Sequence, residues 1–468
     1  MSRTKTLANL FNAQSIAVIG ASNNPCKASH QIIKTMLREE YKGRIFPVNP
    51  QRKDVLGLPC FSSLRDIETS IDLLIISVPA ESVFEALKPA SSRKDIQGAV
   101  ILSAGFSETG LADRINLEKS IASFAKKTGL HIVGPNCIGL INTDNKLCTS
   151  FSPGLKLRPG SLGFLSQSGA FGGSFLMLAG DQPEPLGFSK FAHVGNASDV
   201  SMVDILDYYG QDEQTTTIAM YLEGVINGRD LLDKAKQITS KKHVFSLKVG
   251  KTERGSRAAL SHTATLAGSD RIYDAAFKQG GIVRAESIEE LLDAAKASSK
   301  MPRPRGNRLC VITEAGGPGI IALDELGKKN IMHLASLQES TKKRIKELLP
   351  SMAVICRPEG YIDMTAAAME HEHAEVLRCV LEDDGVDSSI LISVPPTYLP
   401  AESVASAVAD VVREYDKPVA VCLMNGEAMK AARCQLEQAN IPTFDTPDRA
   451  AKAVENLTRA SMSLNRMS

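Results

Sequence analysis

The chain has 468 residues, of which 43% are hydrophobic and 23% charged, and its formal net charge is +1 at pH 7. A single hydrophobic core stops growing at roughly 250–300 residues, so this length predicts several domains. The balanced charge argues against binding nucleic acid or an anionic membrane through a basic surface, and no apolar run reaches the ~18–20 residues of a membrane span.

Two features bear on the cellular compartment. The N-terminal residues lack the basic flank, apolar stretch and small-residue cleavage site of an export signal. The nine cysteines are scattered without a CxxC pair, which favours reduced thiols over disulfides or a zinc site. We therefore expect a cytoplasmic protein, and the sequence contains no metal-ligand pattern.

The first part of the chain alternates short β-branched apolar runs with amphipathic helical stretches, which is the rhythm of parallel βαβ units. The predicted strands lie at 15–20, 44–50, 72–79, 98–106 and 131–136. We expect a Rossmann-like, doubly wound α/β domain over residues 1–150.

Two further blocks follow the same rhythm. Residues 151–161 are rich in turn formers, and the strand-and-helix pattern restarts after them. In the linker 298–307, proline and basic residues replace the apolar period, and a third block then begins. We therefore predict two more α/β domains, over residues 151–298 and 307–468.

Gly20, Ala21 and Ser22 lie between an apolar strand and a helix, where a parallel sheet brings backbone N–H groups toward a phosphate. This placement favours an anion-bearing ligand. A nicotinamide dinucleotide would need GxGxxG here and an acidic residue at the end of the second strand, but that strand ends at Asn49–Pro50. A turn that binds no ligand is the other alternative.

His262 lies among small residues, and a helix start at Gly268–Asp270 follows it. A histidine that accepts a phosphoryl group needs one nucleophilic ring nitrogen, an acceptor on the other nitrogen, and donors that stabilise the phosphate charge. Glu223, at the end of a predicted strand, could orient the imidazole. The alternatives are a buried structural histidine and a surface carboxylate at a strand end.

Two glycine-rich segments could supply the donors. SQSGAFGGS (166–174) and TEAGGPGII (313–321) each place small residues between a predicted strand and a predicted helix. The start of such a helix has free N–H groups and the positive end of the helix dipole, which suit a dianionic phosphate. Glycine at these places could equally serve close packing.

Together these segments resemble a known family. SHTATLAGSDRIYDAAFKQGGIVR (261–284) resembles the phosphohistidine segment in the alpha subunit of ADP-forming acetyl-CoA (acyl-CoA) synthetase, a relative of succinyl-CoA synthetase. Other family motifs are matched, over nearly the whole chain, by SIAVIGAS, PVNP, GPNCIGLIN, FLSQSGAFG, YLEG and AGGPG. The resemblance implies a Rossmann-like CoA-binding domain followed by two flavodoxin-like succinyl-CoA synthetase-type domains.

The resemblance also implies roles for individual residues. His262 would carry the phosphoryl group, with Glu223 as the second catalytic residue. The implied phosphate-binding residues are Ser166, Gln167, Ser168, Gly169, Ala315, Gly316 and Gly317. The implied CoA-binding residues are Gly20, Ala21, Ser22, Asn49, Pro50, Arg52, Val78, Pro79, Ala104, Gly105, Phe106 and Asn136. Gln51 stands where many relatives have lysine, which leaves Arg52 or Lys53 to meet a CoA phosphate.

The implied activity is that of an acid–thiol ligase, which joins a small carboxylic acid to CoA while ATP is converted to ADP and phosphate. The family also uses an ATP-grasp module that holds ATP and Mg²⁺, and no such module is evident in this chain. A separate beta subunit in an α2β2 assembly is therefore implied. Two other functions remain open, a non-catalytic CoA-binding sensor or scaffold and an NAD(P)-dependent oxidoreductase.

Overall fold

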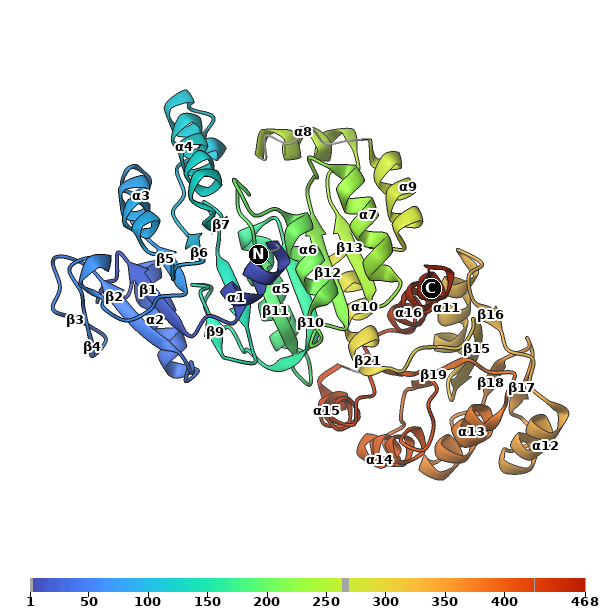
Figure 1. Ribbon diagram of the computed structural model, residues 1–468. Coiled ribbons are helices and arrows are strands. Elements are labelled where there is room, and N and C mark those ends of the chain that lie inside the picture. The colour runs from blue at the N-terminus through green and yellow to red at the C-terminus, as the bar shows by residue number, and fades with distance from the viewer. Residues whose placement is uncertain (1–2, 263–268, 425, 468) are drawn as a thin grey trace. The chain divides into compact units, whose positions relative to one another are not determined.

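The computed structural model describes residues 3–262, 269–424 and 426–467 (Figure 1). Contacts divide the chain into two compact units. Unit 1 comprises residues 1–180, 187–238 and 246–280, and unit 2 comprises residues 181–186, 239–245 and 281–468. None of the described helices is long and apolar enough to cross a membrane.

The first sheet, in unit 1, has five parallel strands in the order β2-β1-β5-β6-β7. Its strands are β1 (Ser15–Ile19), β2 (Arg44–Val48), β5 (Leu73–Ile76), β6 (Gly98–Ile101) and β7 (His131–Val133). Its helices are α1 (Arg3–Phe11), α2 (Ala28–Arg38), α3 (Ala80–Leu87) and α4 (Ala112–Thr128), and a small hairpin is formed by β3 (Asp54–Val55) and β4 (Leu58–Pro59). Counted along the chain, the strand order is 2-1-3-4-5, so the predicted doubly wound architecture is confirmed.

Alternate residues of these strands point to opposite faces of the sheet, as the two-residue period of a strand requires. Ala17, Leu74 and Ile101 pack in one core cluster with Val83 of α3 and Ile121 of α4. Helix α2 covers the opposite face (Figure 1). The sheet is therefore buried on both faces, which explains why its strands are continuously apolar.

The second sheet has the order β14-β13-β12-β10-β11-β8-β9. Its strands are β8 (Gly139–Asn142), β9 (Leu147–Cys148), β10 (Pro159–Ser166), β11 (Phe188–His193), β12 (Thr217–Leu222), β13 (His243–Lys248) and β14 (Val283–Ala285). The helices along this part of the chain are α5 (Gly169–Gly180), α6 (Met202–Gln211), α7 (Gly228–Thr239), α8 (Glu253–His262), α9 (Asp270–Gly280) and α10 (Ile288–Lys300). Strand β10 lies between β11 and β12, parallel to both. Strand β8 pairs with β11 antiparallel, so residues before position 150 contribute to this second sheet.

The third sheet, in unit 2, has the order β17-β18-β15-β19-β20-β21. Its strands are β15 (Arg308–Thr313), β16 (His333–Leu334), which pairs with β15, β17 (Val354–Ile355), β18 (Tyr361–Asp363), β19 (Ser388–Ser393), β20 (Val419–Leu423) and β21 (Thr443–Phe444). Its helices are α11 (Gly316–Gly327), α12 (Glu339–Leu348), α13 (Glu370–Glu382), α14 (Ala401–Val412), α15 (Lys430–Gln438) and α16 (Pro447–Met467). Cys310 and Ile312 pack toward one helical layer, whereas Leu309 and Val311 pack toward the other.

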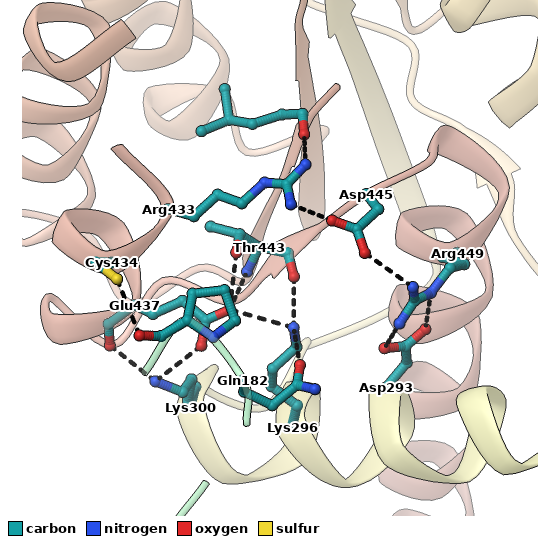
Figure 2. Close-up of polar contacts among 12 residues, drawn as sticks. Gln182, Asp293, Lys296, Lys300, Arg433, Cys434, Glu437, Thr443, Asp445 and Arg449 are labelled. Carbon is teal, nitrogen blue, oxygen red and sulfur yellow. Dashed lines mark hydrogen bonds and ion pairs between the residues drawn. The ribbon is translucent and has the colours of Figure 1, made fainter. Parts of the chain in front are cut away.

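Buried charges hold α10 to the elements that end the chain (Figure 2). Lys296 of α10 lies 3.2 Å from Glu437 of α15 and donates a 2.5 Å hydrogen bond to the carbonyl oxygen of Thr443. Asp293 accepts two hydrogen bonds from Arg449 of α16, at 2.7 and 2.8 Å. Buried charges are tolerated when they are paired in this way, so α10 packs as part of unit 2.

Candidate active site

All strands of the first sheet are parallel, so their carboxyl ends lie along one edge, the usual place of a ligand in such sheets. Every predicted CoA-binding residue lies at this edge or in the loops that leave it. They are Gly20, Ala21 and Ser22 after β1, Asn49, Pro50 and Arg52 after β2, Val78 and Pro79 after β5, Ala104, Gly105 and Phe106 after β6, and Asn136 after β7.

Gly20 lies at the switch point of this sheet, between β1 and β5, where neighbouring connections leave toward opposite faces. Its φ of +85° favours glycine, and a Cβ atom placed there would lie 2.3 Å from the backbone oxygen of Ser77. Glycine is therefore required at this position by the close approach of two backbone segments, whether or not a ligand binds.

The loop that follows Gly20 differs from a simple phosphate-binding turn. The N–H groups of Gly20 and Ala21 both donate to the carbonyl oxygen of Val48, at 3.0 and 3.3 Å, and α2 begins only at Ala28. Asn49 donates to the carbonyl oxygen of Ala21 at 2.8 Å, which joins the loops after β1 and β2. A ligand here would meet the loop from Ser22 onward rather than the first two N–H groups.

A polar network that the sequence did not reveal lies at the ends of β6 and β7. Asn196, in the loop after β11, donates to Glu108 at 2.6 Å and to Glu118 at 2.8 Å, and it accepts from Asn136 at 3.2 Å. Burial alone would raise the pKa of Glu108, but hydrogen bonds from Asn196 and from backbone N–H groups hold it below its usual value. The network fixes Asn136 against a segment of the second sheet.

The turn between β10 and α5 is closed by its own side chains. The Ser166 hydroxyl donates to the carbonyl oxygen of Ser168 at 2.7 Å and accepts from the Ser168 N–H at 3.2 Å. The Ser168 hydroxyl then accepts from the N–H of Phe171 at 3.3 Å, as an N-cap residue does. Because Gly169 and Ala170 lie in the first helical turn, no residue of α5 can satisfy their N–H groups, which suits this turn to an anion.

Gln167 joins this turn to Glu223. Its amide oxygen accepts from the N–H groups of Glu223 and Gly224, at 2.6 and 3.0 Å, and its amide nitrogen donates to the carbonyl oxygen of Gly224 at 2.7 Å. Strands β10 and β12 are parallel neighbours at the switch point of their sheet. The predicted residues Ser166, Gln167, Ser168, Gly169 and Glu223 are therefore brought together in unit 1.

Glu223 itself is 7% exposed. Burial, with the nearby Glu223 carboxylate as a second cause, raises the pKa of Tyr221 to about 12. His262, the predicted phosphoryl acceptor, is the last residue of α8, and its side chain lies outside the described residues. The next residues of its predicted loop, 263–268, lie outside them as well.

The second predicted helix start lies in unit 2. Ala315 is the N-cap of α11, and Gly316 and Gly317 open the helix. The Thr313 hydroxyl donates to the carbonyl oxygen of Ala315 at 2.9 Å and accepts from its N–H at 3.0 Å. Glu314, between them, is a buried residue that the sequence did not single out. It accepts from the N–H of Val394 at 2.6 Å and contacts the buried His373.

Two family models match the chain. A CoA binding domain model matches residues 14–143, and a model described as a succinyl-CoA ligase like flavodoxin domain matches residues 159–298. These ranges contain the first sheet and the β10–α5 turn with Glu223, respectively.

Relatives match along almost the whole chain. The alpha subunit of acetate–CoA ligase (ADP-forming) II from Pyrococcus furiosus is 39% identical over 454 residues, which is 96% of each chain. The alpha subunit of the corresponding ligase I from the same organism is 34% identical and covers 97% of this chain and 98% of its own. This chain belongs to the ADP-forming acyl-CoA ligase family. The recognition made from the sequence motifs is thereby confirmed.

Solved structures of this ligase family agree with the fold. The dinucleotide-forming acetyl-coenzyme A synthetase 1 of Ca. Korarchaeum cryptofilum, in complex with phosphate and ADP, has a TM-score of 0.92 and 33% identity, and the match covers 98% of each chain. Among the described residues of the present ligase-family chain, no group of three or more His, Cys, Asp or Glu side chains could hold a metal ion.

His193 is a further residue beside the candidate site that sequence reasoning missed. It ends β11 and contacts the β10–α5 turn. A polar residue that ends a buried parallel strand lies at the carboxyl edge of its sheet, and this position was the available signal. Burial lowers the pKa of His193 to about 4, so its ring is neutral near pH 7.

Proposed function

We propose that this chain is the CoA-binding, phosphohistidine-carrying subunit of an ADP-forming acyl-CoA synthetase. The observation that carries the proposal is the convergence of Glu223 and the Ser166–Gly169 turn at the switch point of the second sheet. A buried carboxylate beside a helix start offers an acceptor for one imidazole nitrogen and donors for a phosphate. The family match to proteins named as ADP-forming CoA ligases supports the same assignment.

The reaction proceeds through three transfers. A ring nitrogen of His262 attacks the γ-phosphorus of ATP, and ADP leaves. A carboxylate oxygen of the acid then attacks the phosphorus of phosphohistidine, which forms an acyl phosphate and returns His262. The CoA thiol attacks the acyl carbon, loses its proton and expels phosphate. The phosphoryl step is needed because a free carboxylate is a poor electrophile, whereas phosphate is a good leaving group.

Four groups of predicted residues have parts in this scheme. Glu223 orients the His262 imidazole, and the start of α5 stabilises the phosphoryl group through its N–H groups and helix dipole. The start of α11, with Ala315, Gly316 and Gly317, provides a second site of this kind. The carboxyl edge of the first sheet binds CoA, and Arg52 there is an exposed cation suited to a CoA phosphate.

The nucleotide site is assigned to a partner. Acetate–CoA ligase (ADP-forming) I of Archaeoglobus fulgidus, whose name includes no subunit, is 36% identical to this chain, but this chain spans only 64% of its length. We assign the remaining function, the binding of ATP and Mg²⁺, to an ATP-grasp beta subunit in an α2β2 assembly located in the cytoplasm. The acid is a small carboxylate, since relatives are named as ligases of acetate and of 4-hydroxybutyrate.

The test is phosphoryl labelling of the assembled enzyme. The chain is incubated with γ-labelled ATP, Mg²⁺ and a candidate ATP-grasp subunit, and label that is acid-labile and base-stable is measured. Wild-type protein and the control variant His333→Ala, which changes an exposed histidine, should be labelled, whereas His262→Ala should not. Absence of label from wild type in a complex shown to form would instead favour a CoA-binding sensor or scaffold.

A further inference from the structure

His193 joins the CoA edge of the first sheet to the β10–α5 turn. Its Nδ1 atom lies 2.9 Å from the N–H nitrogen of Ile138, and its Nε2 atom lies 3.1 Å from the carbonyl oxygen of Gln167. The side chain is almost fully buried, at 4% exposure. A Cβ atom on Gly169 would lie 3.0 Å from the Cε1 atom of His193, so the turn packs directly on the ring.

These partners determine which nitrogen carries the proton. The Ile138 N–H can only donate, so Nδ1 accepts, and the Gln167 carbonyl can only accept, so Nε2–H donates. This is the neutral imidazole with its proton on Nε2. Because burial lowers the pKa to about 4, the same form persists at neutral pH and both hydrogen bonds are kept.

Each end of this His193 bridge (Ile138, His193 and Gln167) leads to a part of the proposed site. Ile138 lies two residues after Asn136, whose N–H donates to the carbonyl oxygen of Ser103 at 2.9 Å at the carboxyl edge of the first sheet. Gln167 holds the backbone of Glu223 through its side-chain amide. All of these residues lie in unit 1.

We propose that His193 is a positioning residue that sets the distance between bound CoA and the phosphoryl group, and this role rests on the proposed function. Strand β11 lies between β8 and β10 and pairs with both, and the His193 ring adds a side-chain link from Ile138 to Gln167, just beyond the paired strand ends. Transfer of an acyl group to the CoA thiol requires the reacting atoms to be about 3–3.5 Å apart, so loosening the bridge slows this step. Phosphorylation of His262 is less affected, because Ser166 and the Gln167 side chain hold the turn independently.

The test separates the two transfers in the assembled enzyme. His193→Leu removes both hydrogen bonds, and turnover with CoA should fall about 100-fold, the effect of a misplacement of about 1 Å, while labelling of His262 by γ-labelled ATP stays close to wild type. His193→Asn places an acceptor near the Nδ1 position, and His193→Gln places a donor near the Nε2 position. Each of these should recover part of the turnover, and both remain informative if the leucine variant does not fold.

Several outcomes would overturn the inference. Equal losses of labelling and of turnover in all three variants would show a structural residue, and unchanged turnover in all three would show that the bridge is not needed. If the wild-type pH–rate profile has an acidic limb near pH 6.5 that the Asn and Gln variants lack, His193 would instead be a proton carrier. Wild-type protein that takes no label in a formed complex would contradict the proposed function itself, so the two failures are distinguishable.

Discussion

The turns that start α5 and α11 occupy equivalent places in the second and third sheets. In each, a hydroxyl residue at the end of the first strand bonds both the N–H and the carbonyl two residues later, Ser166 with Ser168 and Thr313 with Ala315. In each, the residue between them crosses to the neighbouring strand, from β10 to β12 or from β15 to β19. The same strand order thus builds the same backbone turn twice.

The crossing residue is where the two turns differ. Gln167 is an amide, so it accepts from the N–H groups of Glu223 and Gly224 and also donates to a carbonyl. Glu314 is a carboxyl group, and the hydroxyl of Ser393 and the N–H of Val394 donate to it. By strand pairing, Glu223 occupies the position after β12 that Val394 occupies after β19. The acid therefore follows the neighbouring strand in the second sheet, whereas in the third sheet it is the middle residue of the turn itself.

The difference shows that one backbone geometry can be held by two kinds of side-chain chemistry with different tolerance to change. The Gln167 amide has partners for both its oxygen and its nitrogen, so Glu223 is the acidic residue that the second turn needs to accommodate. A buried carboxyl group needs donors around it, and His373 of α13 contributes to that environment at 0% exposure. We expect the second turn to be adapted to a ligand and the third to depend more strongly on its internal partners.

The largest expected effect is on the third turn. His373→Leu removes the buried partner of Glu314, and the free energy of unfolding should fall by about 3–5 kcal/mol, as for other broken buried pairs. Chemical denaturation measures it. The double variant Glu314→Leu with His373→Leu should be destabilised less than the single variant, because no buried acid is left without its partner. Equal losses in both would contradict the dependence.

Exchanging the crossing residues tests the comparison directly. In Gln167→Glu, a carboxylate oxygen replaces the amide nitrogen that lies 2.7 Å from the carbonyl oxygen of Gly224. Two acceptors then face each other, so the stability should fall by about 2–3 kcal/mol and phosphorylation of His262 should slow. Glu314→Gln should reduce stability without slowing phosphorylation to the same extent. A neutral result for Gln167→Glu would show that the amide is not needed.

The pH dependence of the free energy of unfolding tests the contact of His193 with the β10–α5 turn. The pKa of His193 is lowered from 6.5 to about 4 in the folded chain, so the unfolded chain binds more protons between these values and stability is lost as the pH falls through that window. The His193 share of the loss between pH 7 and pH 5 is roughly 2 kcal/mol. Denaturation of His193→Asn at both pH values should lack this share. The loss from His243, whose pKa burial lowers to about 3, should remain as an internal control.

The smallest expected effect concerns what the two turns share. Ser166→Ala and Thr313→Ala each remove one hydroxyl that closes a turn, and each should lower the free energy of unfolding by about 1 kcal/mol. Because the hydroxyl geometry is the same, the two losses should agree. Labelling of His262 should fall more in Ser166→Ala than in Thr313→Ala, because the Ser166 turn is the one joined to Glu223 through Gln167.

The fold could be predicted from the sequence because the patterns that indicate its strands and helices are local. Alternating apolar runs and helical periods predicted the α/β architecture, and small residues after the strands predicted where helix starts would lie. Elements outside that rhythm were not predicted. Strand β8, at Gly139–Asn142, follows the first block in the chain but pairs with β11 of the second sheet. The proposed boundary at residue 150 therefore stays a prediction.

The sequence by itself determined the α/β architecture and the family to which the chain belongs, and it predicted the segments that bind CoA and phosphate. Only the tertiary structure decided which distant residues contact one another around the candidate site. Gln167 meets Glu223 over a separation of 56 positions, His193 meets Ile138 over 55, and Glu314 meets His373 over 59. Local periodicity cannot encode such pairs, because they form only when strand pairing and helix packing bring segments more than 50 positions apart into contact.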